Sequence, residues 1–213
     1  MRITIVYDNA VRETGLRADW GFSCLIEGSG IPQILFDTGA SGSILLHNME
    51  RLRLDPSDID IIVISHAHGD HSGGLAYLLA ENDDAEIYLP ASVGGAIPGR
   101  KVTRVGEGLQ VCDRVYSTGE LKGIEQSLAL HTDDGIVVVT GCSHPGVGEI
   151  IDAASRYGEV VGIVGGLHGF RDFERLEGLS LVSPCHCTQY KAEIKKLYPD
   201  QCVECGAGLV LDL

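Results

Sequence analysis

Three histidines and one aspartate occupy six consecutive positions in the run His66-Ala67-His68-Gly69-Asp70-His71. The run directly follows residues 58–65, whose apolar side chains predict a buried strand. Imidazole is the commonest metal-binding side chain, and burying so many polar groups without partners would carry a large free-energy cost. The run therefore predicts a metal site at the end of a strand. Its candidate ligands are His66, His68, Asp70 and His71.

The composition indicates one globular domain over residues 1–213, with 44% hydrophobic residues. The first residues alternate like a strand rather than a secretion signal, and no apolar run approaches the roughly 20 residues of a membrane span. We therefore expect a cytoplasmic protein that does not enter a membrane. The formal net charge of -14 disfavours nucleic acid as a partner and favours a small-molecule substrate. The oligomeric state stays open.

Short apolar runs alternate with segments of helical periodicity, which predicts an α/β fold. The expected strands are Ile3–Tyr7, Phe22–Glu27, Gln33–Phe36, Ile59–Ile64, Glu86–Leu89, Val111–Val115, Ser127–His131, Ile136–Thr140, Val160–Val164, Leu179–Val182 and Gly208–Leu211. The expected helices are Ser43–Leu52, Gly73–Glu81, Gly148–Tyr157 and Lys191–Leu197. The glycine-rich segment Val93–Gly99 is typical of a surface loop.

Three predicted strands in the second half each end near a histidine: His144, His168 and His186. Catalytic and binding groups of layered α/β proteins concentrate on such strand ends. The repetition favours convergence on one edge, with His144 and His186 as metal ligands and His168 left open. Two other histidines, His47 in a predicted helix and His131 in a predicted strand, have no such neighbours, so we interpret them as structural or solvent-facing.

The seven cysteines include two close pairs, Cys185 with Cys187 and Cys202 with Cys205. Without a secretion signal, these are expected to be thiols rather than disulfides. An alternative is that the four bind a structural zinc, although Cys-x-Cys is an unusual zinc-binding spacing. Two others, Cys24 and Cys112, fall in strand-like runs and are expected to pack as small hydrophobic side chains.

Together with residues 34–39 before it and Ser72-Gly73-Gly74 after it, the histidine run resembles the metallo-β-lactamase superfamily. The resemblance spans essentially the whole chain and implies a four-layered αβ/βα sandwich with metals at the sheet edges. Residues 21–27, 140–146 and 184–188 resemble one branch of the superfamily, the 7,8-dihydropterin-6-methyl-4-(β-D-ribofuranosyl)aminobenzene-5'-phosphate synthases of methanopterin biosynthesis.

The resemblance implies two metal ions. It places His66, His68 and His144 on the first metal, and Asp70, His71 and His186 on the second. It also implies that Asp37 steadies ligand imidazoles from behind.

This chain departs from the superfamily pattern at two places. Cys142 stands where an aspartate normally bridges the metals, and it is either a soft ligand or a packed thiol without a metal bond; the second interpretation is slightly favoured. The branch usually has a Glu-His pair where Asp19-Trp20 stands here, so no role beyond lining the pocket is expected of that loop.

The resemblance leaves the chemistry open. Two divalent cations, zinc by preference and iron or manganese as alternatives, would activate water for hydrolysis or stabilise a departing diphosphate in a synthase. Asp70 is the candidate general acid or base if it does not bind metal. Three hypotheses follow: a dimetal enzyme acting on a pterin or phosphorylated molecule, a hydrolase of phosphodiesters, lactones or thioesters, and a thiol protein that binds metal or senses redox state.

Overall fold

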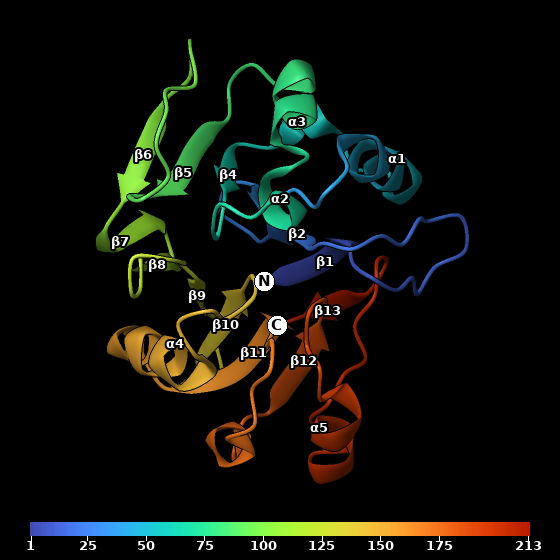
Figure 1. Ribbon diagram of the computed structural model, residues 1–213, viewed down its shortest axis with the longest axis vertical. Coiled ribbons are helices and arrows are strands. Elements are labelled where there is room, and N and C mark those ends of the chain that lie inside the picture. The colour runs from blue at the N-terminus through green and yellow to red at the C-terminus, as the bar shows by residue number, and fades with distance from the viewer.

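Two β-sheets packed face to face form the centre of the protein in the computed structural model, which describes all 213 residues. Figure 1 shows β1 to β6 of the first sheet in the upper half of the molecule and β9 to β12 of the second in the lower half. The first sheet has the order β13-β1-β2-β3-β4-β5-β6, with β1 Arg2–Tyr7, β2 Ser23–Glu27, β3 Ile34–Phe36, β4 Ile61–Val63, β5 Glu86–Pro90, β6 Val102–Val105 and β13 Val210–Asp212. The second has the order β12-β11-β10-β9-β8-β7, with β7 Glu107–Cys112, β8 Val115–Gly119, β9 Leu128–His131, β10 Ile136–Thr140, β11 Val160–Gly166 and β12 Leu181–Cys185.

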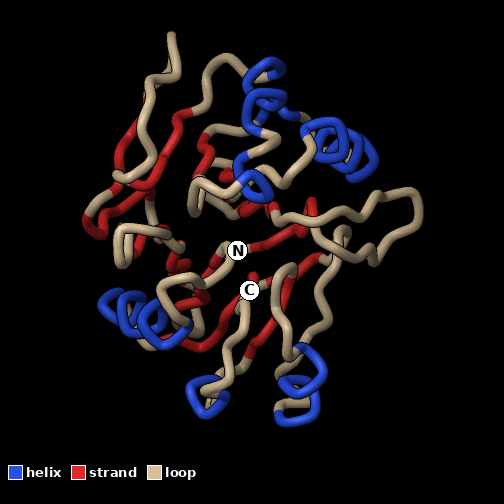
Figure 2. Tube along the Cα trace, in the orientation of Figure 1, coloured by secondary structure: helices blue, strands red, loops and turns tan.

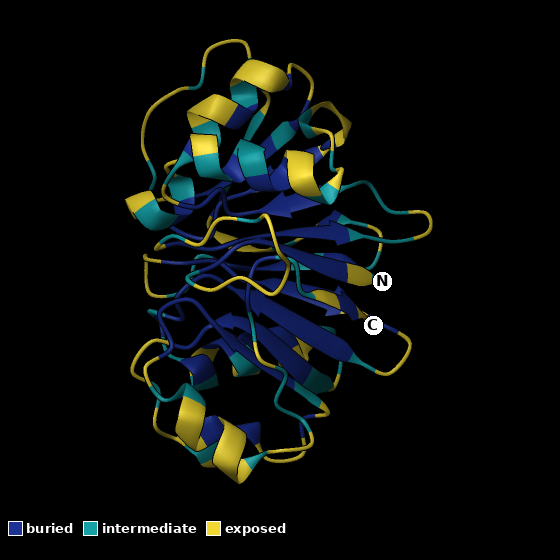
Figure 3. Ribbon diagram, turned by 90° about the vertical axis from the view of Figure 1, so that its right-hand side faces the viewer, coloured by how far each residue is buried: buried dark blue, intermediate teal, exposed yellow.

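Helices cover the outer face of each sheet, as Figures 2 and 3 show. The α-helices are α1 Gly42–Leu52, α2 Gly69–Ser72, α3 Leu75–Glu81, α4 Val147–Ala154 and α5 Lys191–Leu197, and three 3-10 helices span Pro56–Asp58, Ser155–Tyr157 and Phe173–Leu176. Helices α1 and α3 pack on the first sheet, whereas α4 and α5 pack on the second.

Alternation of side chains along the strands explains the layering, because successive residues point to opposite faces of a sheet. In β4, Val63 faces the layer between the sheets, while Ile62 faces α1 and α3. In β10, Val139 faces the same inner layer, while Val138 faces α4. The expected four-layered αβ/βα sandwich is therefore confirmed.

The parallel parts of the two sheets bring several strand ends to one edge. Strands β3 to β6 run parallel to one another, as do β10, β11 and β12. Beyond the carboxyl ends of these strands, the chain continues into the segments that carry the candidate ligands. This topology positions distant parts of the sequence side by side.

Most predicted elements are found within a few residues of their expected bounds, with four differences. The strand predicted over Val111–Val115 is wrong: Cys112 ends β7, Val115 begins β8, and Arg114 between them adopts a left-handed conformation with φ 62°. The segment therefore spans a hairpin turn, with the charged residues Asp113 and Arg114 at its tip. Strand β6 and the one-turn helix α2 were not predicted, and the helix expected from Gly73 begins at Leu75. Val93–Gly99 forms an irregular connection, as expected of a loop.

No helix in the structure has the length and apolar character needed to cross a membrane.

Candidate metal centre

All six predicted ligands gather at the shared edge of the two sheets. His66 follows β4, and Asp70 and His71 lie on α2. From the second sheet, His144 follows β10 and His186 directly follows β12. The rings of His66 and His144 are 4.8 Å apart, and those of His71 and His186 are 5.0 Å apart. The site therefore draws side chains from both sheets.

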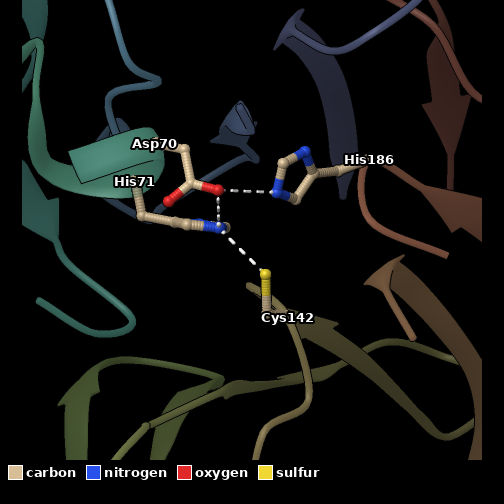
Figure 4. A group of neighbouring side chains, drawn as sticks. All are labelled: Asp70, His71, Cys142 and His186. Carbon is tan, nitrogen blue, oxygen red and sulfur yellow. Dashed lines mark hydrogen bonds and ion pairs between the residues drawn. The ribbon is translucent and has the colours of Figure 1, made fainter. Parts of the chain in front are cut away.

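One tight cluster contains Asp70, His71, Cys142 and His186, whose ligand atoms all lie within 4.8 Å of one another. Figure 4 shows the four side chains pointing toward a common centre. His186 Nε2 is 3.2 Å from Asp70 Oδ2, and His71 Nε2 is 3.1 Å from Cys142 Sγ. Three of the four residues are buried, and Asp70 is half-buried. This is the donor set predicted for the second metal, with a thiol added.

A second cluster contains His66, Cys142 and His144, again within 4.8 Å. The Cys142 thiol belongs to both clusters, so it occupies the place between them. This position favours a bridging ligand over the packed thiol that the sequence slightly favoured, although the side chain is also buried.

His68 lies next to this second cluster, on its open side. Its Nδ1 is 3.0 Å from His66 Nε2, and its ring is 4.9 Å from that of His144. His168 lies farther out on the rim, where its exposed ring is 5.3 Å from that of His144. The remaining histidines, His47 on α1 and His131 at the end of β9, do not take part in either cluster.

Asp37 is fully buried behind the ligands at the end of β3. One of its oxygens lies 2.7 Å from His71 Nδ1 and also accepts a hydrogen bond from the Ser65 hydroxyl at 2.7 Å. The other oxygen accepts the Ser65 backbone N–H at 2.7 Å. Because Nδ1 of His71 is held by the carboxylate, its Nε2 faces the site. This geometry matches the expected role of Asp37 in steadying a ligand imidazole.

Two residues after β1 hold His186 in a similar way. Asp8 accepts the backbone N–H of His186 at 2.7 Å, and Asn9 Oδ1 lies 2.9 Å from His186 Nδ1. Sequence analysis did not single out either residue, because their partner lies more than 170 positions away.

Trp20 forms a wall of the site, as expected of its loop. The indole Nε1 donates a 2.9 Å hydrogen bond to Asp70 Oδ2, and the ring meets the His186 imidazole edge to face at 4.9 Å. The Trp20 side chain nevertheless remains 58% exposed, so it forms the outer boundary of the site.

A buried carboxylate that sequence analysis missed organises the loop carrying Cys142 and His144. Glu125 Oε1 accepts the backbone N–H groups of Gly141, Cys142 and Ser143 at 2.9 to 3.1 Å. Its Oε2 accepts the N–H of His144 at 2.8 Å. The loop thus folds around one acceptor, and no local motif around Glu125 signals this.

The backbone is strained at the same loops. Seven non-glycine residues have positive φ, and four of them, Asp37, Ser143, His168 and His186, lie at this edge. Such conformations cost free energy and persist only where the surroundings hold them. Their concentration here is typical of a functional site.

Comparison with known proteins identifies the family. The model of the metallo-beta-lactamase superfamily matches residues 21–154, which is more than half of the chain. The chain belongs to the metallo-beta-lactamase superfamily. The predicted resemblance is thereby confirmed.

Among the superfamily members that resemble this chain over nearly its whole length are a synthase and a metal-dependent hydrolase. The 7,8-dihydropterin-6-methyl-4-(beta-D-ribofuranosyl)-aminobenzene-5'-phosphate synthase of Methanocaldococcus jannaschii is 25% identical, and the match covers 89% of this chain and 88% of that one. The crystal structure of Tm1679, a metal-dependent hydrolase of the beta-lactamase superfamily, has a TM-score of 0.77 and 28% identity, covering 100% of this chain and 99% of that one.

A third comparison concerns the fold alone. The metallo-beta-lactamase fold protein YhfI from Bacillus subtilis has a TM-score of 0.69 at 12% identity, covering 99% of this chain and 98% of that one.

The electrostatics of this superfamily member keep several imidazoles uncharged. Burial, together with the neighbouring histidines, lowers the pKa of His66 to about 2, and burial lowers the pKa of His186 to about 4. Burial also lowers the pKa of His144. Burial would lower the pKa of His71 too, but the charge and hydrogen bond of Asp37 outweigh it and raise that pKa. Neutral imidazoles are the form that binds a metal ion.

A further observation shows that the donor set suits a divalent cation. The Nε2 atom of His144 is buried and has no hydrogen-bond partner among the protein atoms. His186 Nε2 is also buried, and its contact with Asp70 Oδ2 at 3.2 Å does not have hydrogen-bond geometry. Buried polar atoms in native proteins almost always have a partner. A metal ion would give both imidazoles a well-placed partner. The two clusters together offer four imidazoles, one thiol and one carboxylate, a donor set that suits zinc and its neighbours.

The four C-terminal cysteines do not form the alternative zinc site. Cys185 and Cys205 are joined by a disulfide, which corrects the expectation that both are thiols. Cys187 is buried beside the Cys142 carbonyl, whereas Cys202 is half-buried and its backbone forms an isolated β-bridge with Val182. The four sulfur atoms therefore do not come together as the ligands of one zinc ion. Of the two cysteines expected to pack as small hydrophobic side chains, Cys24 is buried and Cys112 is only half-buried.

Proposed function

We propose that this protein is an enzyme that binds two divalent cations side by side and acts on a small pterin or phosphorylated substrate. The observation that carries the proposal is the pair of ligand clusters sharing the Cys142 thiol. His66, His144 and the adjacent His68 would hold one cation. Asp70, His71 and His186 would hold the other.

When bound, two adjacent cations lower the pKa of a shared water and neutralise charge on a leaving oxygen. The protein's own residues prepare the site for this. Asp37 and Asn9 orient the His71 and His186 rings, and Trp20 orients the Asp70 carboxylate. Burial keeps the His66 and His186 imidazoles neutral. The disulfide Cys185–Cys205 lies directly beside His186 and restrains the strand end that presents it.

The first candidate reaction is a synthase reaction, supported by the 25% identical synthase that matches 89% of this chain. In it, the amino nitrogen of a ribofuranosylaminobenzene phosphate forms a bond to the methylene carbon of a dihydropterin diphosphate. The bond from that carbon to the diphosphate oxygen breaks, diphosphate leaves, and the amine proton passes to water. The site would contribute positive charge where the diphosphate departs.

The test combines metal analysis with a two-substrate assay. Purified protein, His186→Ala and the control His131→Ala are analysed for metal and then incubated with dihydropterin diphosphate, with and without the arylamine. The proposal expects about two metals per chain, and diphosphate release that requires both substrates and is lost in His186→Ala. His131→Ala should match the wild type, because that side chain lies exposed at the end of β9. Metal-free protein with undiminished release would refute the proposal.

Hydrolysis is the second candidate, favoured by the 28% identity to the metal-dependent hydrolase Tm1679 over the whole chain. Steady turnover of a model phosphodiester, lactone or thioester that His68→Ala abolishes would support this reaction over the synthase. Diphosphate release from the pterin without the arylamine would point the same way.

A further inference from the structure

A largely apolar pocket opens beside the metal centre. It has a volume of about 400 Å³ and lies between helix α3 and the segment that connects β5 to β6. Leu75 and Leu79 of α3 form one wall, and Val93 and Ile97 of the connecting segment form another. Pockets of this size accommodate small organic molecules.

The pocket and the metal centre share a wall. Ala67, which lies between His66 and His68, lines the pocket, and so does Ser72, which directly follows His71. The Ser72 hydroxyl donates a 3.0 Å hydrogen bond to the carbonyl of His68, so the two lining residues belong to one compact turn. A molecule in the pocket therefore lies against the turn that carries the predicted ligands.

Arg104 on β6 is the only charged residue that lines this pocket. Its Nη2 donates to the carbonyl oxygen of Gly95, but its Nη1 is buried and has no hydrogen-bond partner. A buried donor without a partner is unfavourable, and a guanidinium binds phosphate and carboxylate oxygens particularly well. No carboxylate lines the pocket, although the chain carries a net charge of -14. The unpaired cation is thus complementary to an anion from outside the protein.

We propose that this pocket binds the apolar, ring-containing part of the substrate and that Arg104 binds an anionic oxygen group attached to it, either a phosphate or a carboxylate. The inference rests on the proposed function in taking the pocket as the substrate side of the same site. Arg104 is a specificity-determining residue in this scheme, because it selects for an anion at a fixed place relative to the metal centre.

Binding rather than turnover tests the inference. Metal-loaded wild type, Arg104→Gln, Ala76→Trp and the control Arg114→Gln are titrated calorimetrically with benzylphosphonate, phenylacetate and the neutral benzyl alcohol. Ala76 lines the pocket on α3, so a tryptophan there would fill it. Arg114 carries the same charge but lies at the β7–β8 turn, where it pairs with Asp133. The thermal midpoint of each variant shows whether it remains folded.

The expected result is at least a roughly tenfold loss of affinity for one or both anions in Arg104→Gln, with unchanged affinity for benzyl alcohol. Ala76→Trp should lose all three ligands, and Arg114→Gln should behave as the wild type. Comparison of benzylphosphonate with phenylacetate shows which anion the pocket takes.

Wild-type affinity for both anions in folded Arg104→Gln would overturn the inference, even if the enzyme turned over its substrates. Conversely, binding that depends on Arg104 in a protein that fails every turnover assay would support the pocket and refute the proposed function.

Discussion

The Glu125 carboxylate accepts the backbone N–H of His144 at 2.8 Å, and its other oxygen accepts the three N–H groups that precede it. Glu125 is itself 1% exposed, so it contacts none of the solvent that could replace these bonds. Glu125 therefore determines the shape of the loop that presents Cys142 and His144. It does so through the backbone and forms no hydrogen bond with the Cys142 sulfur or the His144 ring. This arrangement makes Glu125 a positioning residue.

Replacement of Glu125 by glutamine should destabilise the protein and weaken metal binding. The amide oxygen can replace only one carboxylate oxygen, so an NH₂ group would face a backbone N–H. A buried donor left without an acceptor costs about 1–3 kcal/mol. Urea unfolding of metal-free protein measures that loss, and a chelator competition measures metal affinity. Glu149→Gln, on the exposed face of α4, should change stability by less than about 0.5 kcal/mol. Equal stability of the two variants would contradict this role.

Removal of the Cys142 thiol should reduce the affinity for both metals, because its sulfur lies in both clusters. We expect Cys142→Ala to retain clearly fewer than two metals per chain after dialysis. Elemental analysis provides the measurement, with Cys112→Ala as the control, since Cys112 lies at the end of β7 outside both clusters. Undiminished metal content in Cys142→Ala would restore the interpretation of this residue as a packed thiol.

Chelation of the metal should loosen the site while leaving the sheets intact. Without a cation, the buried Nε2 atom of His144 has no partner, and His186 Nε2 has only its poorly aligned contact with Asp70, which is unfavourable. The thermal midpoint should therefore fall on addition of chelator, with little change in far-ultraviolet circular dichroism. Hydrogen exchange should accelerate in residues 66–72 and 140–146 and not in β1 or β2. An unchanged thermal midpoint would argue against a buried metal centre.

The disulfide between Cys185 and Cys205 predicts five free thiols in the denatured, unreduced chain, out of seven cysteines. A cross-link closing a loop of this length stabilises a protein by about 3 kcal/mol in the chain-entropy model. The Cys185→Ala/Cys205→Ala double variant should lose stability on that order in urea unfolding, and its difference from wild type should shrink under reducing conditions. Titration of seven thiols in the unreduced protein would show that the bond does not form.

Much of the site could be predicted from sequence because its ligands lie at strand ends, where an apolar run followed by a turn and a histidine is a local pattern. His144 and His186 were found in this way. The residues that orient them were not, because Glu125, Asp8 and Asn9 act through contacts that exist only after the chain has folded.

The same distinction explains the error at the cysteines. Spacing alone does not determine which cysteines pair, so the bond between Cys185 and Cys205 could not be read from the sequence. The error at Val111–Val115 has a different cause. The polar pair Asp113-Arg114 at the centre of this segment is a turn signal that the strand prediction overlooked, and Cys112 and Val115 pair across it.

The split of the ligands between the sheets has a consequence for apolar residues that are not ligands themselves. His66 and His71 follow a strand of the first sheet, and His144 and His186 follow strands of the second, so the apolar layer between the sheets acts as a spacer. The thickness of this apolar layer at Val63 and Val139 determines the distance between the ligands from the first sheet and those from the second. Because small misplacements of reacting groups slow catalysis steeply, substitutions in this hydrocarbon layer should tune activity without contacting any ligand.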